Sequence, residues 1–204
     1  LLDAKVDKVD EKDGRITAAW VGDTRYDADV VVVGIGAVPN VELAQEAGLE
    51  CDNGILVNRF MQTSDESIYA IGDCTNFPYQ ALNCRLRLES VQNANDQARC
   101  AARAIFDDPV PYTALPWFWS DQGGVRIQIA GVPHASHVRL VRGSPADDKF
   151  SVLYFDDNKL TCAESVNMPA DHMAARKLIS SAIEVEPEQA ADPQVALKSL
   201  SQAS

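Results

Sequence analysis

Hydrophobic and polar positions alternate in the first part of the chain, as they do in β-strands with one buried face. Residues 5–10 alternate apolar and charged side chains, and Asp13-Gly14 predicts a hairpin turn before a second strand at residues 16–21. Residues 30–33 form a continuous β-branched run, which is typical of a strand covered on both faces. We therefore expect a β-meander that leads into a buried strand.

Apolar residues at helical spacing predict two helices further along. Asn40 is expected to cap a short helix at residues 41–47. A longer helix begins near Glu89 or Ser90 and continues to Ile105, because small and apolar residues recur there every three or four positions. Between the two helices, the apolar run at residues 68–71 predicts a buried strand.

The pattern changes after Asp107-Asp108-Pro109, which ends the long helix and marks a candidate domain boundary. Four strands are expected beyond it, at residues 125–130, 137–142, 150–155 and 160–167, and then a helix at residues 170–181. The tail from Glu184 is acidic and then rich in Ala and Ser. We expect it to be a loosely attached segment with one short helix at residues 194–201.

Composition and charge narrow the function classes. The 204 residues are 46% hydrophobic, which is enough to bury a core as one large domain or two small ones. A formal charge of −12 argues against a surface that binds nucleic acid or an anionic membrane. No apolar run is long enough to cross a bilayer, and the first residues lack a basic segment followed by an apolar one. The default expectation is a soluble, cytoplasmic protein.

Cysteine and histidine usage indicates no metal centre or redox dithiol. The five cysteines are widely spaced, without C-x-x-C, and are expected to be reduced thiols. His134 and His137 lie three apart, but Pro133 and Ser136 mark a turn there, so we expect loop or surface histidines.

Two glycines and one aspartate are candidates for cofactor binding. Gly34 and Gly36 follow the β-branched run and could let a dinucleotide approach the backbone, although Pro39 replaces the third glycine of the usual fingerprint. A tight turn at the end of the strand explains them equally well. Asp73 follows the run at residues 68–71 and could accept hydrogen bonds from sugar or polyol hydroxyls, with Gly72 leaving room for the ligand. The alternative is that Asp73 caps the next turn.

Aromatic and basic residues form two further candidate groups. Trp117 and Trp119 would face the same side of a strand, either as a plug in the core or as a wall beside a planar cofactor. Arg99 and Arg103 share a helix face, with Arg85 and Arg87 upstream. These arginines form either a solvated face or a docking patch for an acidic partner.

Four stretches in order resemble a known family: VVVGIGAVPNVELAQEAGL, TSDESIYAIGDC, RLESVQNANDQAR and LPWFWSDQGGVRIQIAG. They are similar to the C-terminal half of FAD-dependent NAD(P)H:ferredoxin reductases, which are glutathione-reductase-like flavoproteins. The implied fold class is α/β plus α+β: the end of a fold with two dinucleotide-binding domains, followed by a C-terminal α+β domain. The implied domains are the last part of an NAD(P)-binding domain (1–38), the second segment of an FAD-binding domain (39–112) and a C-terminal reductase domain (113–204).

The resemblance also implies roles for the candidate residues. Asp73, beside Gly72, would bind the FAD ribityl chain, and Ser90 and Val91 would present backbone N–H groups to the flavin ring. Trp119 would lie at the flavin as the catalytic aromatic residue. The basic partner-binding residues would be Arg99 and Arg103.

The implied reaction passes electrons from NAD(P)H through FAD to a 2Fe-2S ferredoxin that serves a cytochrome P450 or an aromatic-ring dioxygenase. Both G-x-G-x-x-G loops of the family are missing from the chain, so we expect a fragment whose N-terminal half is absent. Two alternatives stay open. The chain could belong to another pyridine-nucleotide-dependent flavoprotein, or act as an isolated dimerisation or interaction module, including a homodimer.

Overall fold

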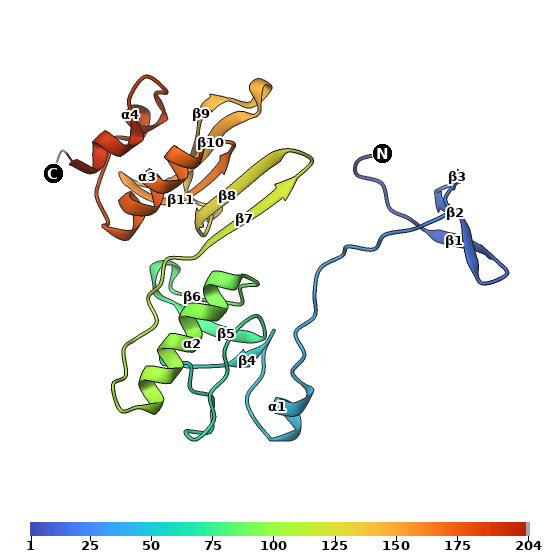
Figure 1. Ribbon diagram of the computed structural model, residues 1–204, viewed down its shortest axis with the longest axis horizontal. Helices are drawn as coiled ribbons and strands as arrows, with labels where there is room; N and C mark the ends of the chain where they lie inside the picture. The colour runs from blue at the N-terminus through green and yellow to red at the C-terminus, as the bar shows by residue number, and fades with distance from the viewer. Residues whose placement is uncertain (203–204) are drawn as a thin grey trace. The chain divides into compact units, whose positions relative to one another are not determined.

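In a computed structural model that describes residues 1–202, the chain divides into two compact units, Leu1–Val38 and Pro39–Ser204. The first unit holds an antiparallel meander of β1 (Lys8–Lys12), β2 (Arg15–Val21) and β3 (Thr24–Asp27), drawn in blue in Figure 1. The predicted meander is therefore confirmed.

The predicted strand at residues 30–33 is wrong. Val30, Val32 and Val33 lie in irregular backbone with exposed side chains, Val32 at 90%. A strand covered on both faces needs hydrogen-bonded neighbours and an apolar layer on each side, and the described residues of this unit supply neither. Gly34 and Gly36 belong to the same extended segment.

The second unit begins with a small sheet and the long helix. Its first elements are α1 (Glu42–Glu46), β4 (Ile55–Leu56), β5 (Thr75–Tyr79), the 3₁₀ turn η1 (Gln80–Leu82), β6 (Cys84–Leu86) and α2 (Val91–Ile105). The N-cap of α1 is Val41 rather than Asn40, and no side chain caps it. Strand β4 runs parallel to β5, and β6 runs antiparallel to β5. A core that includes Met61, Phe77 and Ala101 packs between α2 and these strands.

The strand near Asp73 lies after this residue rather than before it. Within residues 68–71 only Tyr69 makes an isolated bridge, to Gln62, and the strand β5 starts at Thr75. Gly72, with a φ of +85°, begins a turn that is closed by the N–H of Thr75 on its carbonyl oxygen at 3.1 Å, and β5 pairs with β4 from Thr75 onward. Asp73 is thus a turn residue at the start of a strand.

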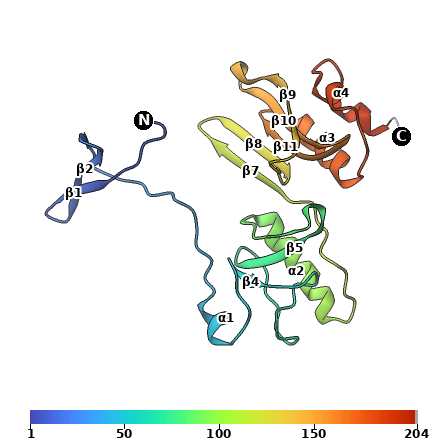
Figure 2. The same ribbon diagram turned by 180° about the vertical axis from the view of Figure 1, so that it is seen from behind.

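A five-stranded antiparallel sheet forms the rest of this unit. Its strands are β7 (Trp117–Gln122), β8 (Val125–Gly131), β9 (Val138–Ser144), β10 (Lys149–Asp156) and β11 (Lys159–Val166), in the order β7-β8-β11-β10-β9, and the 3₁₀ turn η2 (Pro145–Asp147) joins β9 to β10. Figure 2 shows the strands from behind, with α3 (Pro169–Ser180) against them. Leu153, Phe155 and Leu178 fill the core between sheet and helix. The four predicted strands and the predicted helix are confirmed.

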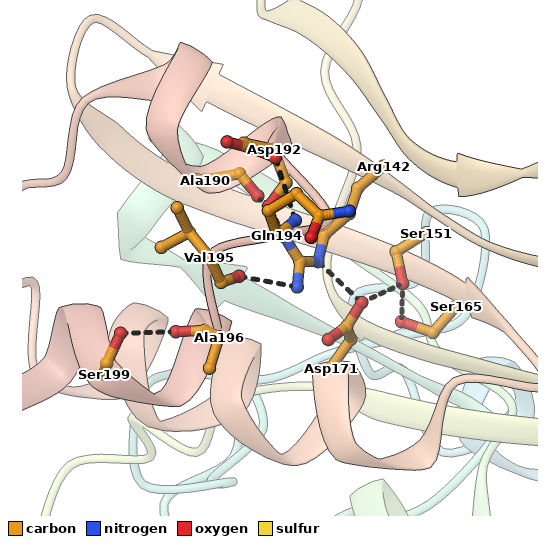
Figure 3. Close-up of polar contacts among 10 residues, drawn as sticks. All are labelled: Arg142, Ser151, Ser165, Asp171, Ala190, Asp192, Gln194, Val195, Ala196 and Ser199. Carbon is orange, nitrogen blue, oxygen red and sulfur yellow. Dashed lines mark hydrogen bonds and ion pairs between the residues drawn. The ribbon is translucent and has the colours of Figure 1, made fainter.

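The C-terminal tail is anchored, which corrects the expectation of a loose segment. It contains α4 (Pro187–Ala191) and the 3₁₀ helix η3 (Leu197–Gln202), and Leu197 is only 2% exposed. Arg142 on β9 donates to the backbone oxygens of Ala190 (3.1 Å), Asp192 and Val195 (2.9 Å), as Figure 3 shows. The same guanidinium pairs with Asp171 at 2.9 Å. A buried cation that needs acceptors therefore fixes the tail to the sheet.

Among residues 1–202, no helix is both long and apolar enough to cross a membrane.

Candidate functional site

The N-terminus of α2 presents free backbone donors. Ser90 is the N-cap, and its Oγ accepts a hydrogen bond from the N–H of Asn93 at 3.1 Å. Within the described chain, the N–H groups of Val91 and Gln92 have no acceptor, and Val91 is 64% exposed. Because the helix dipole places partial positive charge at this end, the first turn of α2 can bind an oxygen that carries negative charge.

A turn that contains Gly72 and Asp73 is fixed to the same helix. The Oε1 of Gln97 accepts from the N–H of Gly72 at 2.7 Å and lies 2.9 Å from the hydroxyl of Thr75. A Cβ placed on Gly72 would lie 3.8 Å from the Cβ of Ala94, so the turn packs against the first turns of α2. The structure therefore brings Gly72 and Asp73 together with the helix that carries Ser90 and Val91.

Asp73 offers an unpaired carboxylate. Its side chain is exposed and makes no hydrogen bond to residues 1–202, so it does not cap the following turn as the alternative proposed. Its backbone oxygen instead accepts from Arg87 Nη1 at 3.2 Å, and the same nitrogen lies 2.7 Å from Glu89. The carboxylate is left available to accept hydrogen bonds from hydroxyl groups of a ligand.

A cavity of about 310 Å³ opens between the start of α2 and the β7–β8 hairpin. Its walls include Ser90 from the helix cap and Trp117, Phe118 and Ile129 from the sheet. The backbone N–H of Trp117 donates to the Oε1 of Gln92 at 3.1 Å, which fixes the hairpin to the helix. The cavity is mainly apolar with polar groups at the helix end, as expected for a site that takes a planar ring.

The two tryptophans of β7 stack on each other. Their ring centroids lie 5.5 Å apart with an interplanar angle of 28°. Trp119 is 37% exposed and Trp117 is half-buried, so the pair is not a plug in the core. Trp117 lines the cavity directly, whereas Trp119 contacts it only through Trp117. The flavin contact predicted for Trp119 therefore stays a prediction.

The four arginines of the proposed basic patch separate into two groups. Arg85 and Arg87 bind backbone and side-chain oxygens of their own subdomain and have structural roles. Arg99 and Arg103 lie on the exposed surface, Arg99 paired with Asp96 at 2.7 Å and Arg103 with Asp108 at 2.6 Å. Two arginines of the candidate patch thus remain exposed, each with a carboxylate beside it, and their role in docking stays a prediction.

Gly34 and Gly36 lie in the first unit, and a Cβ at either would meet no atom within 4 Å. Gly36 has a φ of +97°, which favours glycine at that position. Nothing in their surroundings tests a contact with a dinucleotide, so this role stays a prediction.

Thiol and metal chemistry have little support among the described residues. All five cysteines are free. Burial raises the pKa of the Cys162 thiol to about 12 and also raises that of Cys100, so both resist forming the reactive thiolate. His134 hydrogen-bonds Ser136, and no group of three or more possible ligands gathers within residues 1–202.

Sequence reasoning missed Gln92, Asn93 and Gln97, which are buried on α2. The available signal was the spacing of Asn93 and Gln97, which are four residues apart and therefore share one face of the helix. The residues from which the helix was predicted include Val91 and Ile105, which are exposed, so the buried face is not the predicted apolar one.

Comparisons with known proteins show which families the chain is similar to. Residues 1–98 match the family described as pyridine nucleotide-disulphide oxidoreductase, and residues 117–201 match the one described as reductase C-terminal. Rhodocoxin reductase of Rhodococcus erythropolis is 45% identical over 199 residues, which are 97% of this chain and 46% of that protein. Putidaredoxin reductase of Pseudomonas putida is 42% identical over 188 residues, 91% of this chain and 44% of that protein. The chain spans about half the length of the curated relatives it matches.

Solved structures of ferredoxin reductases have the same fold. The ferredoxin reductase for the CYP199A2 system from Rhodopseudomonas palustris matches with a TM-score of 0.91 and 42% identity, over 97% of this chain and 49% of that one. The covalent putidaredoxin reductase–putidaredoxin complex matches with a TM-score of 0.93 and 37% identity, over 98% of this chain and 50% of the other. The predicted fold class, α/β followed by a C-terminal α+β domain, is confirmed.

Proposed function

We propose that the chain is the C-terminal half of an FAD-dependent NAD(P)H:ferredoxin reductase, because residues 1–98 match the pyridine nucleotide-disulphide oxidoreductase family and residues 117–201 match the reductase C-terminal family. One observation carries the proposal. The unpaired Asp73 carboxylate and the free N–H groups at the start of α2 are fixed to one helix, and an aromatic cavity opens at the end of that helix.

The residues present fit the flavin part of FAD. Asp73 would accept hydrogen bonds from ribityl hydroxyls, and Gly72, with a φ of +85°, would shape the turn that presents this carboxylate. The N–H groups of Val91 and Gln92 would donate to a carbonyl oxygen of the ring, where the helix dipole stabilises added negative charge. Bound FAD would take two electrons from NAD(P)H and release them one at a time.

The partner is a 2Fe-2S ferredoxin. Support comes from the relatives, since one matched structure is a covalent complex of putidaredoxin reductase with putidaredoxin. Another relative is the reductase component of an anthranilate 1,2-dioxygenase system. In this chain Arg99 and Arg103 would attract an acidic ferredoxin, and Trp119 would lie on the route from the cavity to it. The complete protein would work in the cytoplasm, upstream of a P450 or a ring dioxygenase.

Flavin occupancy of the complete reductase tests the proposal. Replacing Asp73 with Ala removes a charged acceptor, and a hydrogen bond to a charged group contributes about 1.5–3 kcal/mol, so FAD affinity should fall roughly tenfold or more. The ratio of flavin to protein absorbance after dialysis measures this loss. Asp147→Ala is the matched control, because Asp147 is also exposed and lies in a turn of the C-terminal sheet. Equal flavin content in the two variants would refute the role of Asp73.

A further inference from the structure

Trp117 is held by three ring or cation contacts on the sheet face that packs against α3. Trp119 stacks on it at 5.5 Å, and the guanidinium carbon of Arg176 lies 4.5 Å from its ring centroid. The imidazole of His172 lies 6.4 Å away and is tilted by 60°. The proposed function assigns no task to Arg176 or His172.

Helix geometry explains why both residues reach the same indole. His172 and Arg176 are four residues apart in α3 and therefore share one face of the helix. The first turn of α3 is fixed by the ion pair between Asp171 and Arg142, whose side chains are only 9% and 5% exposed. One turn later Ala175 is completely buried against the sheet. The backbone that carries Arg176 is thus held against the sheet, where α3 packs on β8 and β11.

Arg176 is the charged group of this cluster. His172 is 1% exposed, and burial lowers its pKa to about 4, so its ring is neutral near pH 7. Among the described residues, no carboxylate forms an ion pair with Arg176, in contrast to Arg99 and Arg103. The charge of Arg176 is therefore directed at the face of Trp117, where the ring quadrupole attracts a cation.

We infer that Arg176 is a positioning residue for the tryptophan pair. Through its contact with Trp117, it keeps Trp117 and Trp119 stacked in one orientation beside the cavity. Only the purpose of that orientation, a fixed aromatic route to the electron acceptor, rests on the proposed function. The contact itself can be tested on the chain alone.

The experiment measures the stack spectroscopically in a Trp20→Phe background, where only the pair contributes indole signals. Two stacked indoles give an exciton couplet in circular dichroism, and Trp117→Phe, which removes one partner, defines its absence. A cation–π contact contributes about 0.5–1 kcal/mol, so Arg176→Met should lower the ratio of stacked to unstacked pairs about two- to fivefold. Quenching of indole fluorescence by acrylamide, a neutral quencher, should rise in parallel.

Two further variants separate positioning from general effects on α3. Arg176→Lys keeps a cation and should restore part of the couplet. Lys177→Met makes the same change of charge on the neighbouring exposed residue and should leave the couplet intact. An unchanged couplet in Arg176→Met, or an equal loss in Lys177→Met, would overturn the inference. Failure of Asp73→Ala to release flavin would count against the proposed function and would leave these spectra unaffected.

Discussion

Replacing Arg142 with Met should destabilise the second unit more than any change at a surface arginine. Methionine keeps most of the aliphatic length but removes the guanidinium. Asp171 then loses its counter-charge at 2.9 Å, and the backbone oxygens of Ala190 and Val195 lose their donor (Figure 3). The side chain of Asp171 is 9% exposed, so water cannot fully replace the lost partner.

The magnitude follows from burial. Breaking a buried ion pair by removing one partner costs about 3–5 kcal/mol, because the remaining charge is stranded. Loss of the hydrogen bonds to the backbone oxygens of the tail adds less to this cost. Two of the three acceptors are only partly buried and can be hydrated if the tail moves away. We expect a loss of about 3 kcal/mol or more in the free energy of unfolding, together with faster amide hydrogen exchange at residues 187–200.

Urea unfolding followed by circular dichroism measures the first quantity, and exchange mass spectrometry measures the second. Arg139→Met on the same strand is the matched control, because Arg139 is exposed and should change stability by no more than about 0.5 kcal/mol. Adding Asp171→Leu to Arg142→Met should recover part of the loss by removing the stranded charge. If Arg142→Met costs no more than Arg139→Met, the ion pair does not hold the tail and the reasoning is wrong.

Three further predictions concern pH, the turn and the partner. The pKa of His172 is lowered from 6.5 to about 4 in the folded chain, so the unfolded state binds more protons between these values, and stability should fall by up to roughly 3 kcal/mol as pH drops from 6.5 to 4. The stability difference between the native chain and His172→Phe should therefore depend on pH in this window, and a flat difference would contradict the lowered pKa. Gln97→Leu leaves the buried N–H of Gly72 without an acceptor, so it should lower the free energy of unfolding by about 1–3 kcal/mol and release FAD from the complete protein. Unchanged stability and flavin content would argue that the hydrogen bond from Gly72 to Gln97 does not fix the turn to the helix. Arg99→Glu should raise the KM for ferredoxin while leaving ferricyanide reduction nearly unchanged, and equal losses with both acceptors would refute docking at Arg99.

Local periodicity predicted the elements that make their own hydrogen bonds or pair with sequence neighbours. Helix α2 was predicted from its spacing, with Glu89 or Ser90 near its start, and Ser90 is its N-cap. The strands β10 and β11 were predicted as successive strands, and they pair with each other. The prediction of a loose tail was wrong because the residue that holds the tail is distant from it in the sequence. Its Ala- and Ser-rich composition resembles that of a loose segment, whereas Arg142 is about 50 residues away from its acceptors.

The prediction of a strand at residues 68–71, before Asp73, was wrong for a different reason. An apolar run predicts burial but not pairing, and Ile68 and Ile71 stay partly exposed beside a turn. The strand β5 begins instead with the polar pair Thr75 and Asn76, which are both buried by their contacts with neighbouring segments. The role proposed for Asp73 does not depend on this error, because a turn that precedes a strand can expose a carboxylate just as the end of a strand can.

The buried amides of α2 are satisfied by residues on both sides of the predicted domain boundary near residue 112. A buried amide without a partner costs about 1–3 kcal/mol, so each must be satisfied by another segment. Asn93 accepts from the hydroxyl of Tyr112 at 2.9 Å, and Gln92 accepts from the backbone N–H of Trp117 at 3.1 Å. Both bonds cross from the helix to the residues around and beyond the boundary. One helix thus fixes the Gly72 turn through Gln97 and the wall of the cavity through Gln92, and the polar groups of the site and its aromatic face keep a constant spacing.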